Sequence, residues 1–160
     1  MNTQIRKVAV LGSGVMGSAI AAHFANAGIP SLVLDIVPPG LPDDASRKQR
    51  NAIVDGAVKA MSRAKPSPLF TRDALALIET GNFDDDLPRI AEADWIVEVV
   101  KEDLEIKKLV LKNAAPHVAD HAWLTTTTSR LSLAPMNAAL PETLRPRFPG
   151  PPLFHPPRYI

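Results

Sequence analysis

Short apolar runs alternate along this chain with longer segments of helical spacing. Runs dominated by apolar or β-branched residues predict strands buried on both faces, as in a parallel sheet, at residues 8–11, 31–34, 95–100 and 122–127. Helical spacing predicts amphipathic helices from about residue 15 and over 102–113. This alternation predicts an α/β fold of the Rossmann type, doubly wound around a mainly parallel sheet with helices on both faces.

A helical hairpin is expected as an insertion after the second strand. Asp43 or Asp44 can cap a helix that continues to about Arg63, where a proline-rich segment ends it. Thr71 can cap a short helix over 72–79. The remaining elements expected are a short strand at 82–83 and short helices at 86–93 and 132–140, the last capped by Ser132.

The C-terminal part is rich in proline. Half of the 16 prolines lie from Pro135 onward, which argues against a central strand there and predicts an extended or loosely ordered tail. We therefore expect one domain over residues 1–146, followed by a proline-rich segment at 147–160.

Composition and charge exclude several classes of function. With 18 basic against 17 acidic residues the net charge is +1, and no window gathers the basic residues that nucleic-acid binding needs. The chain has no cysteine, so disulfides and thiolate chemistry are excluded. No apolar run approaches the length of a membrane span or a secretory signal. A cytoplasmic protein of one domain, with no nucleic-acid or membrane partner, is expected.

The most specific chemical signal is the run Gly12-Ser13-Gly14-Val15-Met16-Gly17, which joins a predicted strand to a predicted helix. In a dinucleotide site Gly12 permits the tight turn, Gly14 lets the backbone approach a pyrophosphate, and Gly17 packs the helix against the strand. The phosphates would contact the N–H groups at the start of the helix near Val15. The alternative is an ordinary glycine-rich loop.

Asp35 ends the second predicted strand, 18 residues after Gly17. A carboxylate in this place can accept hydrogen bonds from both hydroxyls of the adenosine ribose, and it would repel a 2′-phosphate. NAD is therefore favoured over NADP. The alternative is that Asp35 merely ends a strand.

Other chemically capable residues have simpler explanations. His117 and His121 would share a face if they were helical, but Pro116 favours a solvated loop. The run Asp84-Asp85-Asp86 fits either a cation site or a cap of the next helix. We assign no metal site.

Further motifs follow in a fixed order along nearly the whole chain. They are Trp95-Ile96-Val97-Glu98, Glu102 with Lys107, Thr128-Ser129, Arg147-Phe148, Phe154 and Pro156-Pro157-Arg158-Tyr159. Together with residues 8–17 and Asp35, they resemble the NAD-binding domain of the 3-hydroxyacyl-CoA dehydrogenases.

The resemblance implies that the chain binds NAD and that Glu102 and Lys107 line the nicotinamide side of the cofactor. Both residues also fit an ordinary charged helix face. It implies that the Ser129 hydroxyl lies near the substrate oxygen and the nicotinamide, which makes Ser129 the candidate catalytic residue. The implied reaction is oxidation of the 3-hydroxyl of a fatty 3-hydroxyacyl-CoA. In that family a helical C-terminal domain completes the acyl-CoA site and the dimer.

This chain departs from the family pattern where the reaction takes place. The family uses a His held by a Glu to take the hydroxyl proton, but the position of the His is Pro152 here, and the Glu would lie beyond Ile160. His155 replaces an Asn, and an extended segment puts it about 10 Å from the position of the base. Thr127 also replaces an Asn, and Arg130 replaces a small residue.

We expect the chain to bind NAD as the cofactor domain of such an enzyme and to be inactive alone, because the helical substrate and dimerisation domain is absent. A homodimer or a helical partner domain, with an acyl-CoA substrate, would complete it. A non-catalytic dinucleotide-binding or structural module is the alternative. A third reading, a dehydrogenase of another small hydroxy acid, fits the C-terminal motifs less well.

Overall fold

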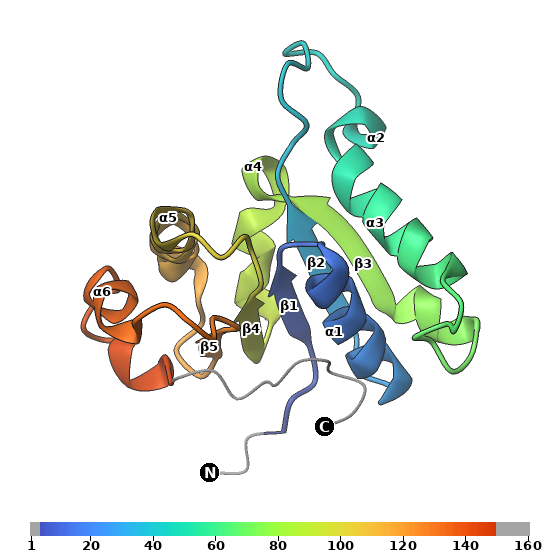
Figure 1. Cartoon of the computed structure of the whole chain (residues 1–160). Helices are drawn as coiled ribbons and strands as arrows, with labels where there is room; N and C mark the ends of the chain where they lie inside the picture. The colour runs from blue at the N-terminus through green and yellow to red at the C-terminus, as the bar shows by residue number, and fades with distance from the viewer. Residues whose placement is uncertain (1–3, 150–160) are drawn as a thin grey trace.

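A five-stranded parallel sheet forms the centre of the molecule (Figure 1), in a computed structural model that describes residues 4–149. The strands run in the order β3-β2-β1-β4-β5 and all neighbours are parallel. Their bounds are β1 Val8–Leu11, β2 Ser31–Asp35, β3 Ile78–Asn82, β4 Trp95–Glu98 and β5 Trp123–Thr126. The predicted parallel sheet is confirmed.

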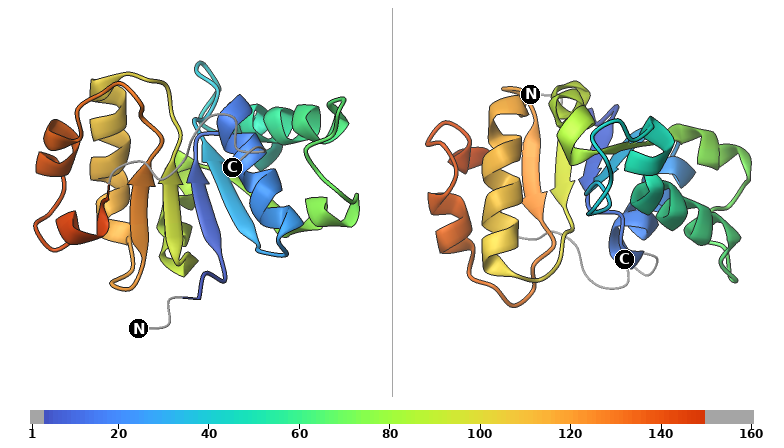
Figure 2. Two further views of the ribbon diagram at one scale, coloured as in Figure 1. Left: turned by 60° about the horizontal axis from the view of Figure 1, so that its bottom comes forward. Right: turned by 90° about the horizontal axis from the view of Figure 1, so that it is seen from above.

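Helices cover both faces of the sheet (Figure 2). On one face, α1 (Val15–Asn26) and α3 (Ala52–Arg63) pack on inward side chains of the central strands, such as Val10 and Val33. On the other face, α5 (Leu104–Ala114) and α6 (Leu133–Ala138) pack against the alternate side chains. Because successive side chains of a strand point to opposite faces, strands without polar interruptions are buried on both sides. The doubly wound fold is confirmed.

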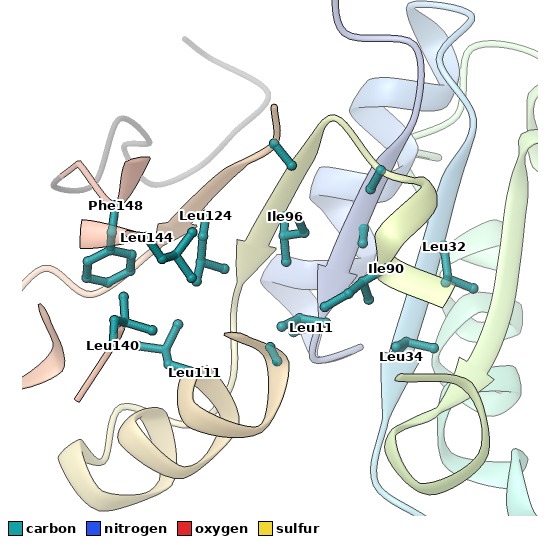
Figure 3. Close-up of a cluster of buried hydrophobic side chains, with 14 of the residues drawn as sticks. Leu11, Leu32, Leu34, Ile90, Ile96, Leu111, Leu124, Leu140, Leu144 and Phe148 are labelled. Carbon is teal, nitrogen blue, oxygen red and sulfur yellow. The ribbon is translucent and has the colours of Figure 1, made fainter. Parts of the chain in front are cut away.

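The larger core lies beneath α5 and α6 (Figure 3). Leu11 and Leu34 of the central strands meet Ile90, while Leu111 of α5 faces Leu124 of β5. The chain after α6 also enters this core, since Leu140, Leu144 and Phe148 are almost fully buried. The expectation of a loosely ordered tail from Pro135 is therefore wrong as far as residue 149. Residues 150–160, including Pro152 and His155, lie outside the described residues.

The insertion after β2 is helical, as expected, but its boundaries differ. It begins with α2 (Arg47–Arg50), which Ser46 caps through a reciprocal pair of hydrogen bonds with Gln49, and continues as α3. Asp43 and Asp44 are not the cap. A serine followed three residues later by glutamine satisfies two orphan N–H groups at once, which a single aspartate cannot do.

The edge of the sheet was predicted incorrectly. The expected helix at 72–79 is a 3₁₀ helix at Asp73–Leu77, and the expected strand at 82–83 is β3, which begins at Ile78. Five register pairs with β2 hold β3 in place. Its sequence Ile-Glu-Thr-Gly-Asn lacks an apolar run because it is an edge strand.

The remaining elements differ from prediction mainly at their ends. The expected helix at 86–93 is α4 (Phe83–Asp86) followed by a 3₁₀ helix at Leu87–Glu92. The helix at 102–113 begins two residues later, after Asp103 as its cap. Ser132 caps α6, as predicted. Between residues 4 and 149 no helix combines the length and apolar character that crossing a bilayer requires.

Candidate nucleotide-binding site

The glycine-rich turn follows β1 at the carboxyl edge of the sheet. Gly12 has a φ of +113°, and a Cβ there would lie 2.8 Å from the carbonyl oxygen of Val99. A Cβ on Gly17 would lie 1.9 Å from the carbonyl oxygen of Gly12. A side chain at Gly12 or Gly17 would therefore overlap backbone, which is consistent with the roles predicted for these residues. A Cβ on Gly14, in contrast, would meet nothing within 4 Å, so the space at Gly14 is open to a ligand.

The N-terminus of α1 is built to receive an anion. Its cap is Gly14, which has no side chain to accept a hydrogen bond, and its first turn has no acidic residue. The first N–H groups of a helix have no partner within the helix, and the helix dipole favours negative charge beside them. Val15 at this end is 90% exposed, so solvent or a ligand can reach the turn. A phosphate would satisfy these donors.

Asp35 at the end of β2 lies against the same turn. Its Oδ2 accepts hydrogen bonds from the backbone N–H of Ser13, at 2.7 Å, and from the Ser13 hydroxyl. Its Oδ1 accepts only the backbone N–H of Ile36, at 2.7 Å, among the described residues. Since a carboxylate oxygen has two lone pairs, Oδ1 retains an acceptor for a ribose hydroxyl. The sequence did not single out Ser13 as the residue that orients Asp35.

Three charged side chains lie together where β4 ends, and we call Glu98, Glu102 and Lys107 the buried charge group after its two buried members; the Glu102 side chain is 31% exposed. Lys107 and Glu98 are both fully buried. The Lys107 Nζ donates to Glu98 at 2.9 and 3.1 Å and to the carbonyl of Val100 at 3.2 Å. Glu102 lies 3.4 Å from the same nitrogen. An exposed charged helix face is therefore excluded for Lys107.

Threonine hydroxyls complete this network. Thr126 of β5 donates to Glu98, and Thr128 donates to Glu102. Burial alone would raise the pKa of Glu102, but the hydrogen bond from Thr128 and the charge of Lys107 outweigh it and lower that pKa. Glu102 is therefore ionised at neutral pH.

Glu98 also accepts a hydrogen bond from the backbone N–H of Val100 at 2.7 Å. Its ion pair with Lys107 was missed. The pattern contained a signal, because Lys107 lies three residues after Leu104 and four before Leu111, on the apolar stripe of α5. A lysine on such a stripe requires a buried partner.

The predicted site residues assemble at one edge of the sheet. The turn after β1, Asp35 after β2 and the buried charge group after β4 all lie at carboxyl ends of parallel strands. The strand order reverses between β1 and β4, which is where open α/β sheets bind ligands. Ser129 is exposed in the loop after β5, next to the buried Thr128. The individual roles of these residues remain predictions.

The alternative sites are resolved by local contacts. His117 ends a short 3₁₀ helix, and His121 lies in the following turn, 3.2 Å from Asp94. Asn82 caps α4 with its side chain, and Asp86 is the N-cap residue of the 3₁₀ helix at Leu87–Glu92 but makes no side-chain cap hydrogen bond there, so the capping interpretation of Asp84–Asp86 holds only for the position of Asp86. Asp85 instead pairs with an arginine of α2. No cluster of potential metal ligands occurs in the part of the chain that the structure describes.

Comparison with known proteins identifies the family. Residues 7–160 match the family model described as "3-hydroxyacyl-CoA dehydrogenase, NAD binding domain". The chain belongs to this family. Its cofactor is accordingly NAD. This agrees with the preference for NAD over NADP that Asp35 predicts.

Among its relatives, a protein of Bacillus subtilis named "Probable 3-hydroxyacyl-CoA dehydrogenase" is 40% identical over 168 residues, which is 100% of this chain and 21% of the relative. A protein of the same name from Deinococcus radiodurans is 38% identical over 157 residues, covering 98% of this chain and 44% of the relative.

Among solved structures, 3-hydroxybutyryl-CoA dehydrogenase of Escherichia coli superposes with a TM-score of 0.71 at 27% identity, covering 98% of this chain and 31% of the other. The chain thus spans less than half the length of each relative and solved structure described here.

Proposed function

We propose that this chain is the NAD-binding part of an enzyme that oxidises the 3-hydroxyl of a 3-hydroxyacyl-CoA in fatty-acid oxidation. Bound NAD would supply the hydride acceptor for that oxidation. The chain's own residues would bind and orient the nucleotide. The turn from Gly12 to Gly17 would hold the diphosphate, Asp35 the adenosine ribose, and Glu102 with Lys107 the nicotinamide side.

The observation that carries the proposal is the open space at Gly14 beside an uncapped helix. The turn needs glycine at positions 12 and 17 to fold, but no contact requires glycine at position 14. The N-terminus of α1 also lacks both a side-chain cap and an acidic residue. A phosphate on these N–H groups would account for both features.

A cationic cavity lies between the C-terminal end of α3 and the 3₁₀ helix before β3, at the edge of the sheet opposite the glycine-rich turn, where it would serve only as an outer site for the phosphates of an acyl-CoA. The cavity, of about 590 Å³, is lined by Arg63, Lys65 and Arg72 together with the hydroxyl side chains of Ser62 and Thr71. None of the three cations forms an ion pair within residues 4–149. The phosphates of coenzyme A are suitable partners for such a set of donors.

Turnover is proposed to require more than these 160 residues. The relatives are more than twice as long, and Pro152 occupies the position that the resemblance gives to the catalytic base. A helical partner domain, or a second copy of the chain, would complete the acyl-CoA site. Pro152 also favours a second candidate, a non-catalytic module that binds NAD without oxidising a substrate.

Calorimetric titration of the purified chain tests the proposal. We expect NAD⁺ to bind, NADP⁺ to bind at least about tenfold more weakly, and Gly14→Val to abolish binding while the fold is retained. Gly56→Ala is the matched control, because Gly56 lies in α3 and an added Cβ would also meet nothing within 4 Å. Absence of heat from millimolar NAD⁺ would refute the proposal, as would unchanged affinity in Gly14→Val.

A second measurement separates the two candidates. Formation of NADH from a 3-hydroxyacyl-CoA is measured with the chain alone and after addition of a helical C-terminal domain from a relative. The enzyme proposal expects turnover only with the added domain. NAD⁺ binding without turnover in both mixtures would favour the non-catalytic module.

A further inference from the structure

The buried charge group does not balance its charges. Its two carboxylates, Glu98 and Glu102, face a single cation, Lys107. The three N–H groups of that lysine are directed to Glu98, to Glu102 and to the carbonyl of Val100. The other side-chain donors on the carboxylates are neutral hydroxyls. The group therefore has a net charge of −1.

Among residues 4–149, no further cation pairs with this group. Lys101 and Arg130 are exposed on the adjoining loops, and neither forms an ion pair with the group in the described part of the chain. Arg130 contributes its backbone N–H to Glu102, which stabilises the carboxylate without adding a cation. Glu98 and Lys107 are fully buried, whereas the Glu102 side chain is 31% exposed, so solvent screens the net negative charge only in part.

The position of the group relative to a bound dinucleotide follows from the strand order. Glu98 pairs in register with Leu11, the last residue of β1, and with Thr126 of β5. Asp35 lies on the opposite side of β1, at the end of β2. A nucleotide with its adenosine ribose at Asp35 and its diphosphate on the turn after β1 must extend its second half toward β4 and β5.

The second half of NAD changes charge on reduction. The oxidised nicotinamide ring is a cation, and accepting a hydride makes it neutral, while the rest of the nucleotide is unchanged. We propose that Glu98, Glu102 and Lys107 act together as a specificity determinant that favours NAD⁺ over NADH through their uncompensated negative charge. The inference rests on the proposed function, because it needs the nucleotide to lie across the edge of the sheet.

The size of the effect follows from Coulomb's law. For scale, two unit charges about 8 Å apart at an effective dielectric constant of about 30 interact strongly enough to change a ratio of affinities about tenfold. Preference for NAD⁺ would help an oxidising enzyme to retain its oxidant and release NADH, a step that often limits turnover.

The test compares dissociation constants of NAD⁺ and NADH for the full chain and for Glu102→Gln. The variant keeps an acceptor for Thr128 but removes the excess charge. We expect the ratio of the NADH to the NAD⁺ dissociation constant to fall about tenfold. Glu105→Gln is the matched control, since it removes the same charge from an exposed site one turn along, where Glu105 pairs with Lys108 within residues 4–149, and it should leave the ratio unchanged.

A second control separates charge from positioning. Thr128→Val removes the hydrogen bond to Glu102 without changing any charge, so it should alter both affinities by the same factor. An equal loss of both affinities in Glu102→Gln, or an unchanged ratio, overturns the inference and leaves the proposed function intact. Failure of the unaltered chain to bind either nucleotide overturns the proposed function and this inference with it.

Discussion

Replacement of Lys107 by methionine is the most demanding test of the buried charge group. Lys107 and Glu98 have no exposed surface, and Lys107→Met keeps a side chain of similar length while removing the charge. The variant loses the bonds to both Glu98 oxygens and to the Val100 carbonyl. Glu98 then remains buried beside Glu102 with no cation between them.

The expected cost is about 3–5 kcal/mol, which is typical of removing one partner of a buried ion pair. Most of it comes from leaving the remaining carboxylate without a counter-charge, rather than from the attraction between the partners. For a domain of this size, each kcal/mol lowers the melting temperature by about 2–4 °C. We therefore expect the melting temperature to fall by about 6–20 °C.

Urea unfolding without added nucleotide measures this cost. Lys108→Met is the control, because Lys108 is on the same helix but its partner in the described part of the chain is the exposed Glu105, and it should cost less than about 1 kcal/mol. The double variant Glu98→Gln with Lys107→Met should cost clearly less than the sum of its single variants. A cost below about 1 kcal/mol for Lys107→Met, or strict additivity in the double variant, would refute the reasoning.

Three further predictions concern stability. Gly17→Ala should destabilise the fold by about 3 kcal/mol or more in urea unfolding, since its Cβ would overlap the carbonyl oxygen of Gly12; a cost near zero would contradict this. Gly56→Ala should stabilise the protein by about 0.5–1 kcal/mol in the same assay, because it lies inside α3 with free space around it, and any loss would refute that view. Burial alone would raise the pKa of Asp94, but hydrogen bonds from two backbone amides outweigh burial and lower that pKa. The Asp94 carboxylate therefore stabilises the folded chain above about pH 4, and this contribution is lost as the pH falls further. Asp94→Asn should therefore be less stable at neutral pH and lose less stability toward pH 3 than the unaltered chain, and parallel pH profiles would be the contrary result.

The elements that could be predicted from the sequence are those with a local pattern of apolar or β-branched residues. Strands β1, β2, β4 and β5 lie inside the sheet or beneath a helix layer, so their apolar runs could be recognised directly. Strand β3 could not, because its residues Ile-Glu-Thr-Gly-Asn form no apolar or β-branched run and its position depends on pairing with β2. Its pairing is a tertiary interaction between distant segments, and it overrides the local helical pattern.

The candidate site divides in the same way. The turn from Gly12 to Gly17 and the acid at Asp35 have a fixed local spacing, and both could be found from the chain alone. The pairing of Glu98 with Lys107 could not, since it joins the end of a strand to a helix through a loop of undetermined path. Sequence spacing gave Lys107 two interpretations, and only its burial distinguishes them.

The three glycines of the turn are required for different reasons, so the motif carries more information than its pattern alone. A chain that folded this way without binding a nucleotide would still need Gly12 and Gly17, because a Cβ at either would overlap backbone. It would not need Gly14. A serine or aspartate cap there would satisfy an orphan N–H group, and an acid in the first turn of α1 would add about 0.3–1 kcal/mol. Since α1 has neither feature, its N-terminus lacks a stabilising contribution that an anionic ligand would supply. Gly14 is therefore explained by ligand binding rather than by the requirements of the fold.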